Sequence, residues 1–312
     1  MKHTLTRAAI VSGILFIVIV VGNVVIVAQN AVTGTWAADT SQQFKKDGTP
    51  RDSDIQINFE RQSSNGSGKN QFGHGMKFDE LRGLTRDQAE NGSVRFSLVR
   101  EAGTIECQGS FSAGKGKGTF TFTPDKAFFE AMRTRGFDFS RSRDDSRTTF
   151  EDRALTAAFV NVTLSLADDL LSANFGSLDV DDLFKAAIFK IDGRFMAEMK
   201  ATGFPDLKME DLVKARIFKI DAEYVRQVHT MGFDNNDFED LVKYRIFKIT
   251  PEFLAEIKSA GLTDIDGESI VKCRIFNIDG DFIRKVRADD PNASIEDMIS
   301  IKIGVARKKN VQ

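Results

Sequence analysis

The chain has 312 residues, of which 41% are hydrophobic and 28% charged, so it has the composition of a globular protein with room for about two domains. Lysine and arginine number 43 against 45 acidic residues, and the net charge of -2 gives no general argument for a nucleic-acid partner. Phenylalanine is abundant at 27, against two Tyr and one Trp, which favours packing over a polar binding site.

Residues 1–31 predict a signal peptide or a signal anchor. Lys2 and Arg7 precede a run without charge from Ala8 to Ala28. About 21 helical residues are just long enough to cross a hydrocarbon core of about 30 Å. Ile26 occupies the -3 position of the best cleavage site, which favours an uncleaved anchor over a cleaved signal. We expect the chain from about residue 32 to be extracytoplasmic. It would be anchored to the cytoplasmic membrane by the N-terminal helix, or secreted or periplasmic after cleavage.

Residues 32–122 alternate apolar and polar side chains with a period of two, which is typical of strands with one buried face. The clearest runs are Ile55–Phe59, Val94–Leu98 and Ile105–Phe111. Turn residues at Glu101–Gly103 and Gly114–Gly118 join successive strands. We predict a small antiparallel β domain, either a sandwich or an open barrel, with Trp36 in its core. A polar stretch over 62–75 predicts a long loop.

A series of residues then returns every 29 positions. Each unit opens with an isoleucine, and most units contain a near-copy of the phrase Arg-Ile-Phe. The opening residues are Ile191, Ile220, Ile249 and Ile278, and the phrases begin at Arg216, Arg245 and Arg274. A period of this length indicates small supersecondary units stacked in a row, because one unit alone cannot bury its apolar face.

Each clean unit reads as two short helices. The first ends at Gly203, Gly232 or Gly261, and the second begins at Asp237, Asp266 or Ser294. Thr123-Pro124 matches Thr250-Pro251, which extends the array backwards. We therefore predict degenerate repeats over 123–190 with a polar insertion from Asp138 to Arg147, clean repeats over 191–305 and a basic tail over 306–312. The fold class is α+β: a β domain followed by an α-solenoid-like array of about six units.

Two columns of cations recur in this array, Lys214, Lys243 and Lys272 in one and Arg216, Arg245 and Arg274 in the other. Stacking would align them into a basic edge for an anionic partner: lipid head groups, a polyanionic glycan or an acidic protein face. The alternative is that they stabilise helix C-termini and pair with acidic residues of the next unit.

No catalytic, metal or cofactor residue is predicted. The three histidines are far apart and lack zinc-binding spacing. Gly114–Thr119 lacks the phosphate-loop pattern and joins two strands, which favours a hairpin. Cys107 and Cys273 fall in different predicted domains, as two unpaired thiols or as a bridge between the domains.

The phrase from Thr250-Pro251-Glu252-Phe253 through Gly261-Leu262 to Ile270–Ile275 resembles tandem repeats of uncharacterised bacterial envelope proteins. Some of those repeats are fused to BlaR/MecR-type membrane metallopeptidases. Segments such as Gly34-Thr35-Trp36 also resemble the β module that accompanies the repeats. This chain has no HExxH sequence, so the resemblance implies no peptidase chemistry here.

These patterns predict a non-enzymatic extracytoplasmic binding or scaffold protein that uses a helical-repeat surface for protein–protein interaction. Its partner would be another envelope protein or an anionic surface, with the membrane contacted through the N-terminal segment and no nucleic acid bound. One alternative is an envelope ligand sensor with a pocket in the β domain. Another is an enzyme whose active-site residues are not adjacent in sequence.

Overall fold

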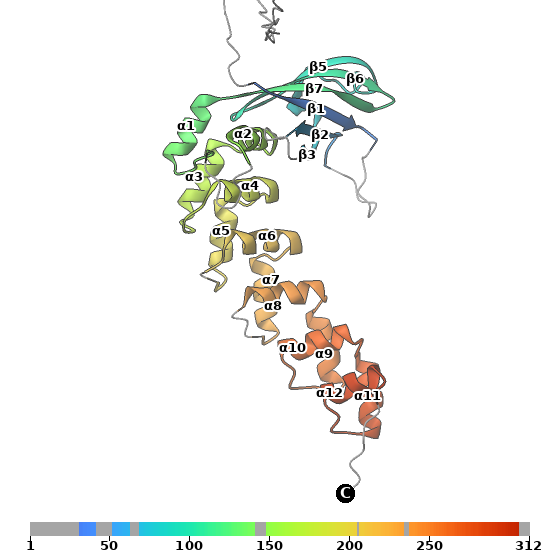
Figure 1. Ribbon diagram of the computed structural model, residues 1–312. Coiled ribbons are helices and arrows are strands. Elements are labelled where there is room, and N and C mark those ends of the chain that lie inside the picture. The colour runs from blue at the N-terminus through green and yellow to red at the C-terminus, as the bar shows by residue number, and fades with distance from the viewer. Residues whose placement is uncertain are drawn as a thin grey trace, which may run out of the picture.

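A computed structural model describes residues 31–41, 52–62, 69–140, 148–204, 206–233 and 237–305. Within them, one antiparallel sheet is followed by twelve α-helices, which confirms the α+β class (Figure 1). The predicted signal segment, most of the polar insertion and the basic tail lie outside the described residues.

The sheet has seven strands in the order β3-β2-β1-β7-β6-β5-β4, and it curls into a half-barrel (Figure 1). The strands are β1 (Val32–Asp39), β2 (Ile55–Gln62), β3 (Lys69–Met76), β4 (Leu81–Arg82), β5 (Asn91–Arg100), β6 (Gly103–Ser112) and β7 (Lys115–Pro124), with a 3-10 turn η1 (Phe78–Glu80) before β4. One curled sheet agrees with the predicted open barrel and not with the sandwich.

Two boundaries differ from the prediction. The predicted loop over 62–75 contains β3, which pairs with β2 along its length, for example Phe59 with Phe72. Its glycines hide the alternation of side chains, but backbone pairing needs no side chain. The first helix begins after Asp125, which caps it, and not at Thr123-Pro124, because β7 continues through Pro124.

Trp36 is buried in the core of the sheet, as predicted, and it explains the glycine-rich hairpin. Its indole nitrogen donates to the Gln108 carbonyl at 3.2 Å. A β-carbon at Gly109, Gly116 or Gly118 would lie 2.7 Å from an indole atom or closer still to other atoms, so no larger residue fits there. These glycines therefore serve the packing of the tryptophan.

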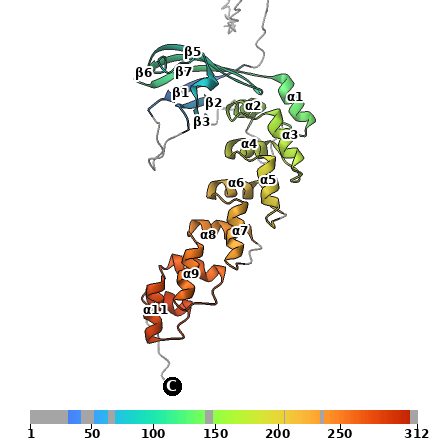
Figure 2. The same cartoon turned by 180° about the vertical axis from the view of Figure 1, so that it is seen from behind.

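Helix α2 (Phe150–Phe159) packs against the apolar face of the sheet, on β3, β6 and β7 (Figures 1 and 2). The ring of Phe159 lies 5.5 Å from that of Phe59 and 6.0 Å from that of Phe72. Most of the helix is buried: its alanines, Leu155 and Phe159 lie in the core, and Asp152 and Arg153 are buried with them. Because this helix belongs to both layers, it attaches the sheet to the helices.

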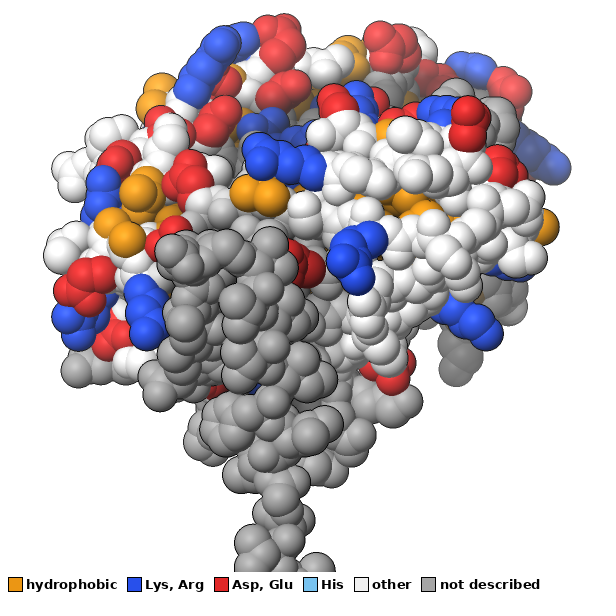
Figure 3. Space-filling view, turned by 90° about the horizontal axis from the view of Figure 1, so that it is seen from above, with side chains coloured by type: hydrophobic (Ala, Val, Ile, Leu, Met, Phe, Trp, Pro, Cys, Tyr) orange, Lys and Arg blue, Asp and Glu red, His pale blue; other side chains and the backbone are white. Residues whose placement is uncertain are grey.

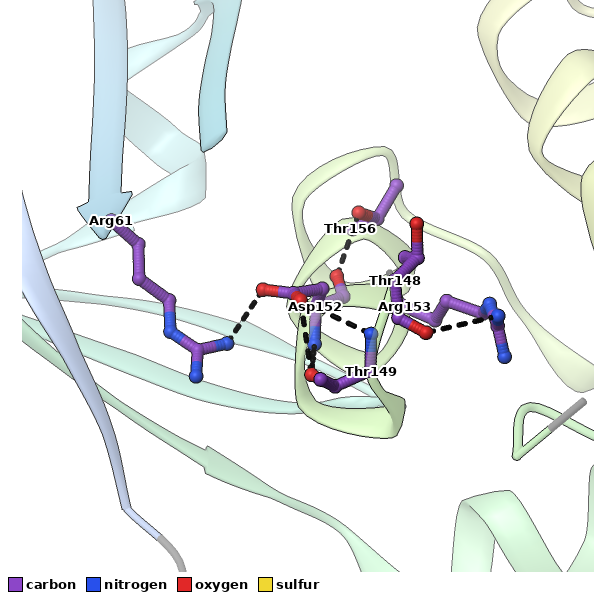
Figure 4. Close-up of polar contacts among 6 residues, drawn as sticks. All are labelled: Arg61, Thr148, Thr149, Asp152, Arg153 and Thr156. Atoms are coloured by element: carbon purple, nitrogen blue, oxygen red, sulfur yellow. Dashed lines mark hydrogen bonds and ion pairs between the residues drawn. The ribbon is translucent and has the colours of Figure 1, made fainter. Parts of the chain in front are cut away.

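A polar contact fixes the start of α2 (Figure 4). Asp152 is buried. Its carboxylate accepts hydrogen bonds from the Thr149 amide and hydroxyl and forms an ion pair with Arg61 of β2 at 2.7 Å. The buried Arg153 points the other way and donates to the Phe139 and Thr148 carbonyls at 2.7 and 3.2 Å. The sheet and α2 are therefore joined by an ion pair beside the aromatic contacts.

The remaining helices follow in pairs. They are α1 (Lys126–Thr134), α3 (Leu164–Ser172), α4 (Val180–Phe189), α5 (Gly193–Lys200), α6 (Met209–Phe218), α7 (Ala222–Thr230), α8 (Phe238–Ile246), α9 (Pro251–Ser259), α10 (Gly267–Ile275), α11 (Gly280–Asp289) and α12 (Ile295–Lys302). Even-numbered helices contact one another in the series α4, α6, α8, α10, and odd-numbered neighbours such as α3 and α5 or α9 and α11 do so too. The result is two rows that lead away from the sheet (Figure 1).

Caps and turns set the length of these helices as predicted. Asp237, Asp266 and Ser294 each accept a backbone amide of the helix that follows. Gly203 and its counterparts Gly232 and Gly261 have φ between +82° and +113°, where other residues are strained. Helices of eight to ten residues are marginal alone, so contact between units has to hold them.

Candidate functional site

The three arginines of the predicted edge make the same contact in successive units. Each guanidinium lies over an aromatic ring of its own unit: Arg216 over Phe195 at 3.7 Å, Arg245 over Tyr224 at 3.6 Å and Arg274 over Phe253 at 3.5 Å. In the last unit, Lys302 takes this role over Phe282 at 4.2 Å. Each contact joins an even-numbered helix to the odd-numbered helix before it, so a cation–π interaction connects the two helices of one unit.

The same guanidinium groups also complete a helix end. Arg216 donates to the Lys190 carbonyl at 2.7 Å, and Arg245 donates to the Lys219 carbonyl at 2.8 Å. Arg274 makes the corresponding contact to Lys248 at 3.3 Å. The acceptor residues lie just after the preceding even-numbered helix, in the left-handed region. Each arginine therefore stabilises the turn that ends the preceding unit.

The lysine column bridges units in the same direction. Lys214 pairs with Glu239, and Lys272 lies 3.8 Å from Glu296, in each case at the start of the next even-numbered helix. An equivalent in an earlier unit, Lys185, pairs with Glu210 at 2.5 Å. The hydrogen bond with Glu239 raises the pKa of Lys214. These glutamates also sit where the helix dipole favours negative charge.

Most cations of the predicted edge connect neighbouring units. Lys243 is the exception among the lysines, because its ion pair with Asp240, at 2.8 Å, stays within one helix. Binding of an external partner by these six side chains stays a prediction. Lys214 and Lys272 show the alternative that the sequence also allowed, which is pairing with acidic residues of the next unit.

Sequence reasoning missed a second repeated feature on the same helices. Ile188, Ile217, Ile246 and Ile275 are each about half exposed, at 53, 54, 52 and 48%. Two residues after each comes a left-handed residue: Lys190, Lys219, Lys248 or Asn277, with φ of 52° to 55°. The isoleucine is part of the repeated Arg-Ile-Phe phrase, but the repeat alone does not show whether it is buried or exposed. We call these residues the Ile/Lys row.

The described cavities of the β domain lie on the outward face of the sheet. One of about 490 Å³ is lined by Arg82, Arg95, Glu106 and neutral polar side chains such as Gln108 and Thr119. Seen from above, this side of the molecule carries mostly uncharged side chains with scattered charges of both signs (Figure 3). The inward face holds Trp36 and α2 instead, so these cavities are open and polar.

Both cysteines are buried and free, Cys107 in β6 and Cys273 in α10, so they form no bridge in this structure. Burial raises the pKa of both thiols, that of Cys273 to about 11. Within the described ranges, no group of three or more His, Cys, Asp and Glu is placed to hold a metal ion. A raised carboxyl pKa occurs at Asp182, because it is desolvated, but this residue closes the capping box of α4.

No single helix among the described residues is long and apolar enough to span a membrane. The pair α2 and α3 reaches that length and composition together, with a bend of 89° between them.

Comparison with known proteins adds no family. No family model matches the chain, and neither a curated protein nor a solved structure matches it. The resemblance to envelope repeat proteins thus stays a prediction, and the functional argument rests on the geometry.

Proposed function

We propose that this chain is a non-enzymatic binding protein whose helical pairs form an α-solenoid-like array with a partner-binding surface. The observation that carries the proposal is the repeated joint between units. The same arginine, aromatic ring and left-handed carbonyl meet in three successive units. A repeated joint places equivalent surface residues in line, and such extended surfaces are what stacked repeats use for binding.

The array would work outside the cytoplasm with another envelope protein as its partner. Support for this location comes from the apolar run Ala8–Ala28 and from the resemblance to envelope repeat proteins. With the β domain next to that run, the array would project the binding surface away from the membrane. A protein partner fits a surface of mixed charge better than a polyanionic glycan does, since glutamate pairs with Lys185, Lys214 and Lys272 of the array.

A second candidate, a ligand sensor in the β domain, is favoured by one observation. The 490 Å³ hollow contains Arg82 and Arg95, whose guanidinium groups have no ion pair within the described residues. A small anionic ligand is the chemistry that two arginines suit. The hollow is open and lies on the outward face, whereas specific small-molecule sites are mostly enclosed, so we rank this candidate lower.

Capture from an envelope extract by the immobilised full chain tests the two candidates together. Glutamate is introduced on the array at Lys219 and Lys248, or at Gln227 and Lys258 on the odd-numbered helices, and on the sheet at Arg82 and Arg95. The array hypothesis expects a captured protein that is lost with one of the two array variants and is retained by the sheet variant. Loss with the sheet variant alone would contradict it and support the sensor.

The arginines that stack on aromatic rings are unsuitable for this test. Reversal of Arg245 to glutamate would remove the contact with Tyr224 and leave the Lys219 carbonyl without its donor. A weaker capture would then report damage to the array and not a lost contact with the partner. Lys219 and Lys248 project outward, so their reversal isolates the surface.

A further inference from the structure

A single position in the even-numbered helices carries a large apolar side chain, two residues before the left-handed residue that ends the helix. Its occupants from α2 to α10 are Phe159, Ile188, Ile217, Ile246 and Ile275. The four isoleucines are about half exposed, although isoleucine is among the residues most often buried. Because these helices contact one another in series, the isoleucines recur in line along the array, and exposed apolar surface of this kind marks interaction sites.

The first member of this series shows what the position does when it is covered. Phe159 is only 4% exposed, because the rings of Phe59 and Phe72 from the sheet lie over it. At this position of α2, the helix therefore already packs against another structural element of the protein, the sheet. The isoleucine row continues this interface along the array, where no described residue covers it.

The lysines that follow the isoleucines give a second, independent observation. Lys190, Lys219 and Lys248 have φ of 53° to 55°, where glycine or asparagine is less strained. Asparagine occupies the equivalent positions after α2 and α10, at Asn161 and Asn277. The backbone carbonyls of these lysines accept hydrogen bonds from the arginines, but any residue would supply that carbonyl. This role therefore does not explain the lysine side chains. Within the described residues the ammonium groups of Lys219 and Lys248 have no ion pair, so no described acidic side chain neutralises their charge.

This charge identifies the kind of partner. A second copy of the chain would place lysines opposite lysines along the row, which repels. The aspartates nearest in sequence, Asp192 and Asp221, keep their charge, but each carboxylate is held at the start of its own helix, where it accepts a backbone amide. The corresponding residue after Lys248 is the neutral Thr250. The row therefore suits apolar side chains flanked by acidic ones.

Spacing decides between a helix and a strand as the partner element. Packed helices lie about 8–10 Å apart, so successive isoleucines recur at about that interval. A helix presents the same face every seven residues, or about 10.5 Å. A strand presents the same face at multiples of about 6.7 Å, which matches this interval poorly.

We propose that the Ile/Lys row binds an amphipathic helix of another protein, with an apolar residue at every seventh position and Asp or Glu on either side. Each isoleucine packs against one apolar residue of that helix, and Lys219 and Lys248 pair with its carboxylates. This inference rests on the proposed function, and it specifies both the surface and the partner.

The test uses the purified full chain and a fluorescent synthetic peptide of about 24 residues, with leucine every seventh position and flanking glutamates. Fluorescence anisotropy should show binding to the wild type. Binding should weaken by at least about tenfold in the double variant Ile217→Ser, Ile246→Ser. The double variant Lys219→Glu, Lys248→Glu should lose as much, and more at low ionic strength.

Matched controls lie on the odd-numbered helices, outside the row. Leu171→Ser changes an apolar residue that is 42% exposed outside the row, and Lys258→Glu reverses an exposed lysine of α9. Both should bind the peptide like the wild type, and a peptide of scrambled sequence should not bind. Circular dichroism checks that every variant keeps the helical content of the wild type.

Three results would overturn the proposal: no binding of the peptide by the wild type, equal binding by the double variants, or equal losses in the controls. Vesicles of phosphatidylglycerol serve as the competing probe. Sedimentation with vesicles, lost in both double variants while the peptide is ignored, would assign the row to a lipid surface and also overturn it. Capture from an extract that depends on the odd-numbered helices would leave the proposed function standing and refute this inference alone.

Discussion

Replacement of Arg245 by alanine should loosen the array at one joint. The guanidinium lies 3.6 Å from the centre of the Tyr224 ring and donates to the Lys219 carbonyl at 2.8 Å. An exposed cation–π contact is worth about 0.5–1 kcal/mol, and a hydrogen bond from a charged donor adds about 1 kcal/mol at a solvent-exposed site. We therefore expect the free energy of unfolding to fall by about 1–2 kcal/mol.

The control is Arg226→Ala on the neighbouring helix. The side chain of Arg226 is exposed, at 66%, and its ion pair with Glu223 lies within α7. Its loss should cost less than about 0.5 kcal/mol. Arg245→Lys should fall between the two, because lysine keeps the charge and loses the planar group.

Urea denaturation monitored by circular dichroism measures the total effect, and hydrogen exchange shows where the array opens. A stacked array need not unfold in one step, so exchange should rise first in α7 and α8 of the Arg245→Ala variant. Equal stability losses in Arg245→Ala and Arg226→Ala would refute the reasoning. So would increased exchange spread evenly over all units.

Three further outcomes follow from the same contacts. Phe159→Ala should lower the free energy of unfolding by about 3–4 kcal/mol. Ile217→Ala, at the equivalent but exposed position, should lower it by less than about 1 kcal/mol. Equal losses in urea denaturation would contradict the difference in burial. Asp152→Ala should lower the free energy of unfolding by about 3 kcal/mol, because the half-buried guanidinium of Arg61 loses its carboxylate partner. A loss as small as that of an exposed ion pair would contradict this prediction. Burial raises the pKa of the Cys273 thiol from 9.0 to about 11, so its contribution to stability is complete below pH 9 and is lost as the pH rises towards 11. The fall of the free energy of unfolding with pH should steepen between pH 8 and pH 10, towards about 1 kcal/mol per pH unit at pH 10, and this part should vanish in Cys273→Ala.

The β domain and the helix pairs follow from local patterns in the sequence. Period-two alternation and turn residues locate β2, β5, β6 and β7, and the caps Asp237, Asp266 and Ser294 locate helix starts. The strand β3 escapes this reasoning because its glycines carry no pattern, and pairing with β2 alone defines it. The position of α2 under the sheet also escapes it, since contacts between segments far apart in sequence leave no periodic signal.

The candidate site is less predictable for a related reason. A repeated column shows that a residue matters, but it does not distinguish a contact between units from a contact with a partner. Arg245 and Ile246 are neighbours in the same phrase, yet the arginine joins two units through the Lys219 carbonyl while the isoleucine faces solvent. Only the three-dimensional placement of the preceding unit separates them. The exposed isoleucine is unexpected from its hydrophobicity, which predicts the core.

Photo-cross-linking from the Ile/Lys row tests the central claim most directly. A photoreactive residue replaces Ile246 in the full chain, and a matched chain carries it at the exposed Ala255 on α9. In cells that produce the protein, the account predicts one protein adduct from position 246, joined through an acidic segment with apolar residues every seven positions, and none from position 255. The absence of an adduct at 246, or the same adduct from both positions, would contradict it.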